Sequence, residues 1–151
     1  MRRQSRSDQS LDTTWPTVIV VDTNIICYRW IPSSHSPDAD KALAKDPDWI
    51  APLLWRSEFR NALTGAMRQN LITLEAANDL VDKAEWHFVN CEFAVSSRAV
   101  LNLIANSGCS AYDCEFVALA EDQRVPLITS DRQILHDFPE TAVSLQKFVR
   151  E

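Results

Sequence analysis

Glycine is scarce in this chain of 151 residues, which contains only Gly65 and Gly108. Two isolated glycines cannot form a phosphate-binding loop of the G-x-x-x-x-G-K-[ST] type, and the motif does not occur. Histidine is also rare, with three residues, and the four cysteines form no C-x-x-C pair. A zinc site built from cysteine and histidine is therefore not expected, and the cysteines are predicted to be reduced thiols in or near the core.

The sequence also lacks a long apolar run and an excess of positive charge. No apolar segment approaches the length that crosses a bilayer, and the arginine-rich start is followed by polar residues rather than by the hydrophobic region of a secretory signal. We therefore expect a cytoplasmic protein with no membrane partner. The net charge of −6 argues against a broad basic surface for duplex nucleic acid. It does not exclude a small RNA-cleaving site in which divalent cations offset the acids.

The remaining composition fits a globular protein, with 46% hydrophobic residues. Residues 1–14 are predicted to form a polar, mobile tail and residues 15–151 a single domain. Apolar runs predict strands at residues 18–21, 49–51, 92–95, 125–129 and 142–145. Helical patterns lie between them, at residues 24–30, 38–45, 53–69, 74–88, 97–105, 110–121 and 131–136. This alternation predicts an α/β fold with a parallel sheet.

The helices at residues 53–69 and 74–88 have the clearest apolar periodicity. A connection of about three residues would make them an antiparallel helical hairpin. We expect this hairpin to protrude and to offer a dimer or partner surface. The tryptophans at positions 30, 55 and 86 are expected to pack in the core, with a partner-binding groove as the alternative.

Two acidic residues directly follow predicted strands. Asp22 comes after the apolar residues 18–21, and Asp131 comes after residues 127–130 in the same arrangement. The carboxyl ends of parallel strands meet at one edge of the sheet, where ligand crevices form. Each residue has a simpler explanation as the N-cap of the helix that follows.

Two further acids lie on predicted helices. Asp113 completes an S-x-x-D capping signature with Ser110, yet Phe116 and Val117 place it on the buried side of its helix. A carboxylate there costs free energy unless it is paired, hydrogen-bonded or bound to metal. Glu58 lies on the rim of an apolar stripe, and its simpler explanation is a surface acid.

Electrostatics indicates what a cluster of these four acids would bind. Two unit charges about 5 Å apart repel by roughly 3 kcal/mol at an effective dielectric constant of 20, so several carboxylates in one cleft would destabilise the fold. A divalent cation relieves this repulsion. Hard oxygen ligands favour Mg²⁺, or Mn²⁺, over zinc.

The acidic segments resemble the four motifs of PIN-domain ribonucleases, and in particular those of VapC-type toxins of toxin-antitoxin pairs. The likeness covers residues 17–145. Its motifs are Asp22-Thr23-Asn24 after a buried strand, Glu58 on the third helix, Ala111-Tyr112-Asp113 at the start of a helix, and Leu127-Ile128-Thr129-Ser130-Asp131.

The resemblance implies a five-stranded parallel sheet flanked by helices and Mg²⁺-dependent hydrolysis of RNA, with Mn²⁺ as a possible substitute. It also implies a homodimer that is inhibited by a cognate antitoxin, and tRNA or rRNA are candidate substrates. The catalytic acids would be Asp22, Glu58, Asp113 and Asp131. Of these, Asp22, Asp113 and Asp131 would hold the metal, with Asn24, Thr129 and Ser130 as polar support.

Two other functions stay open. The first is a phosphatase that forms an aspartyl-phosphate on Asp22, although Asp22-Thr23-Asn24 lacks the second acid of a D-x-D motif. The second is a non-catalytic interaction module whose acids bind metal.

Glu115 departs from the family pattern, but it lies about 160° around the helix from Asp113 and need not share the cleft. Four arginines near the acids in sequence are expected to be surface charges, with phosphate contact as the alternative; these are Arg29, Arg56, Arg60 and Arg132.

Overall fold

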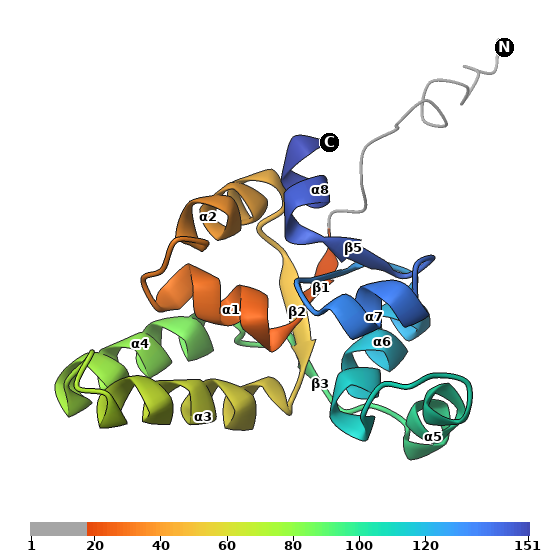
Figure 1. The fold of residues 1–151 in the computed structure, drawn as a ribbon, viewed down its shortest axis with the longest axis horizontal. Helices are drawn as coiled ribbons and strands as arrows, with labels where there is room; N and C mark the ends of the chain where they lie inside the picture. The colour runs from red at the N-terminus through yellow and green to blue at the C-terminus, as the bar shows by residue number, and fades with distance from the viewer. Residues whose placement is uncertain (1–17) are drawn as a thin grey trace, which may run out of the picture.

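A computed structural model describes residues 18–151 of the chain (Figure 1). Five strands form one parallel sheet in the order β3-β2-β1-β4-β5. The predicted α/β fold with a five-stranded parallel sheet is confirmed. The tail predicted for residues 1–14 lies outside the described residues. The strands are β1 (Ile19–Val21), β2 (Trp49–Pro52), β3 (Glu92–Phe93), β4 (Leu127–Thr129) and β5 (Ala142–Ser144).

Strand β1 is the centre of the sheet, and all three of its residues are fully buried. Val20 is paired with Ile50 of β2 on one side and with Leu127 of β4 on the other. From β1 the chain builds β2 and β3 outward in one direction and later β4 and β5 in the opposite direction. The strand order therefore reverses between β1 and β4. Open parallel sheets bind ligands at the carboxyl ends of their strands beside such a reversal.

Helices cover both faces of the sheet. Helices α1 to α4 lie on one side in Figure 1, and α5 and α6 lie on the other. The C-terminal helix α8 packs against α2 and the last two strands. The helices are α1 (Thr23–Trp30), α2 (Ser36–Lys45), α3 (Trp55–Arg68), α4 (Leu74–His87), α5 (Ser97–Ala105), α6 (Ala111–Gln123), α7 (Arg132–Asp137) and α8 (Leu145–Arg150).

Several element boundaries differ from the sequence-based expectation. Helix α2 begins at Ser36 rather than residue 38, because Pro37 lies in its first turn, where a missing N–H costs nothing. Strand β3 is shorter than residues 92–95. Helix α8 was not predicted at all. Its N-cap is Ser144, whose hydroxyl accepts the N–H of Lys147 at 3.2 Å, although Ser144 is also the last residue of β5.

Helices α3 and α4 form the expected protruding hairpin (Figure 1). Trp55 is fully buried and Trp30 is nearly so, as predicted. The prediction for Trp86 is wrong, because its side chain is 79% exposed. The buried positions of α4 are Ala77 and Ala84, and Trp86 lies two residues beyond Ala84, on the opposite side of the helix.

Two of the arginines near the acids belong to the scaffold. Arg56 binds Glu92 through Nε and Nη2 at 2.6 and 2.7 Å and Glu85 at 2.9 Å, which joins α3 to α4 and β3. Arg29 pairs with Asp40 at 3.4 Å. Neither Arg29 nor Arg56 lines the pocket that contains the four acids. Within residues 18–151, the helices are too short or too polar for any of them to cross a bilayer.

Candidate active site

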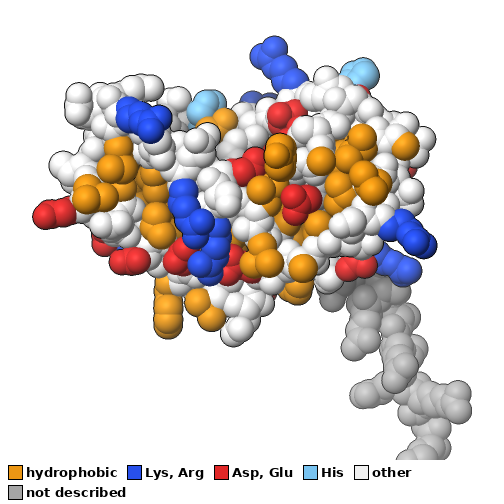
Figure 2. Space-filling view, turned by 90° about the horizontal axis from the view of Figure 1, so that it is seen from below, with side chains coloured by type: hydrophobic (Ala, Val, Ile, Leu, Met, Phe, Trp, Pro, Cys, Tyr) orange, Lys and Arg blue, Asp and Glu red, His pale blue; other side chains and the backbone are white. Residues whose placement is uncertain are grey.

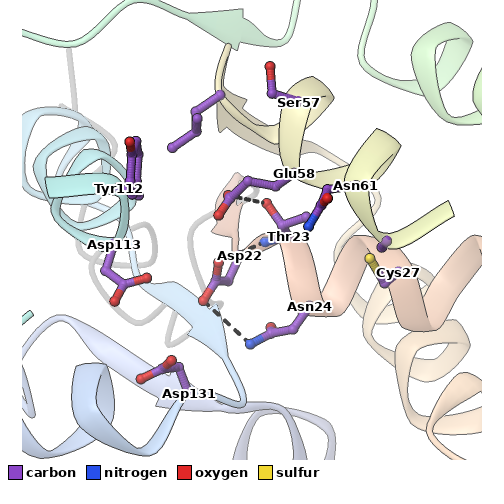
Figure 3. Close-up of a pocket in the computed structure, with 12 residues that line it drawn as sticks. Asp22, Thr23, Asn24, Cys27, Ser57, Glu58, Asn61, Tyr112, Asp113 and Asp131 are labelled. Atoms are coloured by element: carbon purple, nitrogen blue, oxygen red, sulfur yellow. Dashed lines mark hydrogen bonds between the residues drawn. The ribbon is translucent and has the colours of Figure 1, made fainter. Parts of the chain in front are cut away.

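A pocket of about 500 Å³ opens at the carboxyl ends of β1 and β4 (Figure 3). All four acids singled out in the sequence line it, and their side chains point into the same space. They come from four separate segments of the chain. The pocket is lined by Asp22, Thr23, Asn24, Cys27, Leu54, Ser57, Glu58, Asn61, Ala62, Tyr112, Asp113 and Asp131.

Asp22 is the most buried of these acids, with 7% of its surface exposed. Its Oδ1 accepts the N–H of Thr23 at 2.8 Å, which caps α1, and its Oδ2 accepts the hydroxyl of Thr129 at 2.7 Å. Burial raises the pKa of Asp22 to about 7, and the charges of Glu58 and Asp113 act in the same direction. Near neutral pH this carboxyl is therefore held between its charged and neutral forms unless a positive charge lies beside it.

Thr129 links the two acids that follow strands. Its buried hydroxyl donates to Asp22 and accepts the N–H of Asp131 at 3.0 Å. Asp131 in turn accepts the N–H of Ile134 at 3.0 Å and so caps α7. The simpler explanation as helix caps is therefore correct for both Asp22 and Asp131, and it does not remove them from the pocket.

Asn24 and Ser130 lie beside this link. The amide of Asn24 donates to Asp22 Oδ2 at 3.5 Å, and its oxygen accepts the N–H of Ser130 at 3.4 Å. The Ser130 hydroxyl is buried and has no hydrogen-bond partner in the described part of the chain. Of the predicted supporting residues, Asn24 and Thr129 therefore contact the Asp22 carboxylate, and Ser130 is held by Asn24 beside them.

The other two acids enter from helices. Glu58, on α3, accepts the hydroxyl of Thr23 at 2.8 Å, and burial raises its pKa, with smaller contributions from the charges of Asp113 and Glu115. Asp113 lies in the first turn of α6, where its N–H donates to the Ser110 hydroxyl at 3.1 Å. Burial and then the nearby charge of Asp131 raise the pKa of Asp113. Asp22, Glu58 and Asp113 are therefore harder to ionise than free carboxyl groups, first because they are buried and then because other acids are close.

The part of the chain that the structure describes contributes no positive side chain to this pocket. No lysine, arginine or histidine of residues 18–151 lines the pocket. All four acids do lie at helix N-termini: Asp22 and Asp131 are N-caps, and Glu58 and Asp113 are in first turns. The positive ends of the helix dipoles offset a part of the carboxylate charge.

Several pocket residues were not identified from the sequence. Asn61 lies three residues after Glu58 on the same side of α3, so helical spacing could have indicated it. Cys27 lies four residues after Thr23 on α1 by the same rule. Burial raises the pKa of the Cys27 thiol to about 12, which leaves it protonated and a poor nucleophile. Tyr112 is part of the Ala111-Tyr112-Asp113 motif, but it was not predicted as a site residue.

Asp137, on α7, fixes the loop that precedes α6. One of its oxygens, Oδ2, accepts the N–H of Gly108 and the amide of Gln133, both at 2.8 Å. A side chain at position 108 would be crowded, because a Cβ there would lie 3.2 Å from Gln133 Nε2. Asp137 thereby ties the segment that carries Asp113 to the helix that Asp131 caps. No local pattern in the sequence could have shown this contact.

Three comparisons relate this chain to known proteins. The PIN domain family profile matches residues 19–141. Ribonuclease VapC3 from Pyrobaculum aerophilum is 29% identical over 125 residues, which cover 80% of this chain and 95% of that protein. The crystal structure of PAE2754 from Pyrobaculum aerophilum has the same fold, with a TM-score of 0.71 and 20% identity over 92% of each chain. Because the family profile spans most of the sequence, the chain belongs to the PIN-domain family.

Proposed function

We propose that this protein is a divalent-metal-dependent endoribonuclease and the toxin of a toxin-antitoxin pair. The observation that supports this most is the charge of the pocket, in which four carboxylates lie together and no basic side chain of the described residues offsets them. A hard divalent cation supplies the missing charge, and Mg²⁺ or Mn²⁺ suits an all-oxygen site. The name of VapC3 as a ribonuclease favours RNA as the substrate.

Asp22, Asp113 and Asp131 would hold the ion, directly or through water. No three acidic, histidine or cysteine side chains in residues 18–151 are placed to bind one ion by direct bonds alone. This arrangement fits Mg²⁺, which usually takes one or two protein carboxylates and keeps several waters. When bound, such an ion activates a water for attack on the phosphodiester and stabilises charge on the scissile phosphate and the leaving oxygen.

The remaining residues would position these groups. The Thr129 hydroxyl donates to one oxygen of Asp22 and accepts the backbone N–H of Asp131, so it would hold the two acids in fixed positions relative to each other. Glu58 is oriented by the Thr23 hydroxyl and would orient the attacking water or complete the shell around the ion. Asn24 would hold the Asp22 carboxylate and the Ser130 backbone in place, because its amide hydrogen-bonds to both.

A phosphatase reaction through Asp22 is poorly supported by the geometry. Both carboxylate oxygens of Asp22 already accept short hydrogen bonds, at 2.8 and 2.7 Å, and the side chain is 7% exposed. A nucleophile needs an oxygen that is free to approach phosphorus. The non-catalytic metal-binding module is the alternative that the experiment below must separate.

The toxin assignment carries two further proposals, a homodimer and a protein antitoxin. The hairpin of α3 and α4 supports a protein partner, because large apolar side chains are exposed along it and just beyond it. They are Leu71, Leu74, Trp86 and Val89, with 71%, 61%, 79% and 52% exposure. The RNA is a tRNA or rRNA in our proposal.

The test compares wild type with Asp113→Asn and with Asp122→Asn, an exposed acid on the same helix. Purified proteins are incubated with tRNA and rRNA in Mg²⁺, in Mn²⁺ and in chelator. Wild type and Asp122→Asn should cleave only with metal, and Asp113→Asn should be slower by about a hundredfold or more. Equal cleavage by all three would indicate a contaminating nuclease and refute the assignment. Metal binding without cleavage, measured by calorimetry, would instead identify the non-catalytic module.

A further inference from the structure

A second cavity, of about 400 Å³, lies between the start of α5 and the start of α6. We call it the side groove. Its walls are largely apolar, and its polar groups are those of Ser97, Tyr112 and Glu115. On the half of the molecule that carries α5 and α6, hydrophobic side chains gather around acidic ones (Figure 2). The apolar residues of the groove are Val95, Val100, Leu101 and Ala111.

The side groove adjoins the catalytic pocket. Tyr112 lines both cavities, and it directly precedes Asp113. The charge of Glu115 contributes to the raised pKa of Glu58, so these two carboxylates are within electrostatic reach of each other. A chain molecule with one group in the pocket can therefore place its neighbouring group in the groove.

The charges of the groove decide which part of RNA fits. No lysine or arginine in the described part of the chain lines it, and Glu115 would repel a phosphate. An uncharged base meets no such repulsion. The ring of Tyr112, which is 63% exposed, is available for stacking, as aromatic side chains do with unpaired bases.

Glu115 also determines which bases fit. No hydrogen bond to its carboxylate is present in the described residues, and it lies half-buried at the groove wall. A carboxylate accepts hydrogen bonds from exocyclic amino groups, such as N4 of cytosine. It is repelled by the carbonyl oxygens that uracil presents in the same place.

We propose that the side groove binds the base of the nucleotide next to the scissile phosphate in single-stranded RNA, and that it selects a base with an amino group over uracil. This inference rests on the proposed ribonuclease function. Tyr112 stacks on the base and Glu115 accepts from its amino group. A second copy of the chain is the competing occupant, since Leu101 is 63% exposed.

The test uses short single-stranded RNAs that differ only in the base beside the cleaved bond. Wild type should cleave the adenine, cytosine or guanine form with a kcat/KM about tenfold above the uracil form. Glu115→Gln should reduce this ratio to within about twofold. Tyr112→Ala should lower kcat/KM for every RNA, and Tyr112→Phe should restore it. The control, Glu121→Gln, changes an exposed acid on the same helix and should alter neither rate nor preference.

A second measurement does not depend on cleavage. Methyl resonances of Val95, Val100 and Leu101 are followed by NMR while cytidine, adenosine or uridine is added. Methyl shifts that appear with cytidine and adenosine and weaken in Glu115→Gln would support base binding in the side groove. If no RNA is cleaved but these shifts are seen, only the ribonuclease assignment fails. Cleavage without base preference would overturn the groove proposal and leave the ribonuclease assignment intact. Methyl shifts that follow protein concentration instead of nucleoside would show that a second copy covers the groove, and would also overturn the proposal.

Discussion

Removing the charge of Asp22 is expected to stabilise the metal-free protein at alkaline pH. In the folded state the pKa of Asp22 is about 7, against an ordinary value of 3.8. The unfolded chain therefore releases this proton first as pH rises, and the contribution of Asp22 to stability falls between about pH 4 and pH 7. Across that interval the loss is about 4 kcal/mol at about 1.4 kcal/mol per pH unit, as an upper bound. Asparagine does not titrate and avoids the loss.

The substitution also has a cost. Asparagine keeps one oxygen for the Thr23 N–H but cannot accept the Thr129 hydroxyl with its amide, which costs about 1 kcal/mol. The net expectation for Asp22→Asn is a gain of about 2 to 3 kcal/mol at pH 8 and a change near zero, or a small loss, at pH 4. Urea unfolding followed by tryptophan fluorescence, with chelator present, measures both values.

Two further arms complete this experiment. Asp122→Asn, at an exposed position, should change stability by less than about 0.5 kcal/mol at either pH. Adding Mg²⁺ at pH 8 should stabilise wild type more than Asp22→Asn, because only wild type keeps the full set of acids. If Asp22→Asn loses the same stability at pH 4 and pH 8, burial of the carboxylate does not strain the fold and Asp22 acts as a helix cap alone.

Three other changes test parts of the scaffold. Asp131→Ala should be about 1 kcal/mol less stable in thermal unfolding than Asp131→Asn, which can still cap α7, while metal-dependent cleavage is lost in both. Arg56→Met should lower the free energy of unfolding by about 1 to 2 kcal/mol in urea, since it leaves the Glu92 carboxylate with the Trp55 indole N–H but without its positive partner, whereas the exposed pair removed by Lys83→Met should cost about 0.5 kcal/mol or less. Asp137→Asn should lower the melting temperature at pH 7. Hydrogen bonds hold the pKa of Asp137 below its ordinary range, so the difference from wild type should shrink as the pH falls below about 4; a constant difference would contradict this cause.

The element types could be predicted because apolar runs and helical periodicity alternate clearly along the chain. An element boundary could not be predicted where one residue has two roles. Ser144 ends β5 and caps α8, and the short helix that follows has too few turns for its periodicity to be read. Trp86 shows the limit of residue type as a guide to burial, because its place around α4 outweighs its hydrophobicity.

Some residues of the site could be predicted from the sequence, but the contacts that hold them in place could not. Asp22 and Asp131 follow from parallel-strand geometry, since both lie at the edge where β1 and β4 end. The place of Glu58 came from the family resemblance, because a lone acid on a helix rim carries little information. The bridge through Thr129 and the tie between Asp137 and Gly108 span 107 and 29 residues of sequence. Contacts of that separation depend on the assembled fold and leave no local pattern.

For Asp22 and Asp131, the role as helix caps and the proposed role in the site follow from one structural fact. A helix that follows a parallel strand begins at the carboxyl edge of the sheet, and an acid that caps it necessarily faces that edge. Glu58 and Asp113 bring two more helix N-termini to the same pocket. Each N-terminus contributes at most about half a positive charge, so four of them offset up to about half of four ionised carboxylates. In the proposed function, one divalent cation would neutralise the remaining charge of about −2, and a pocket balanced in this way could admit an RNA phosphate that a bare acidic cluster would repel.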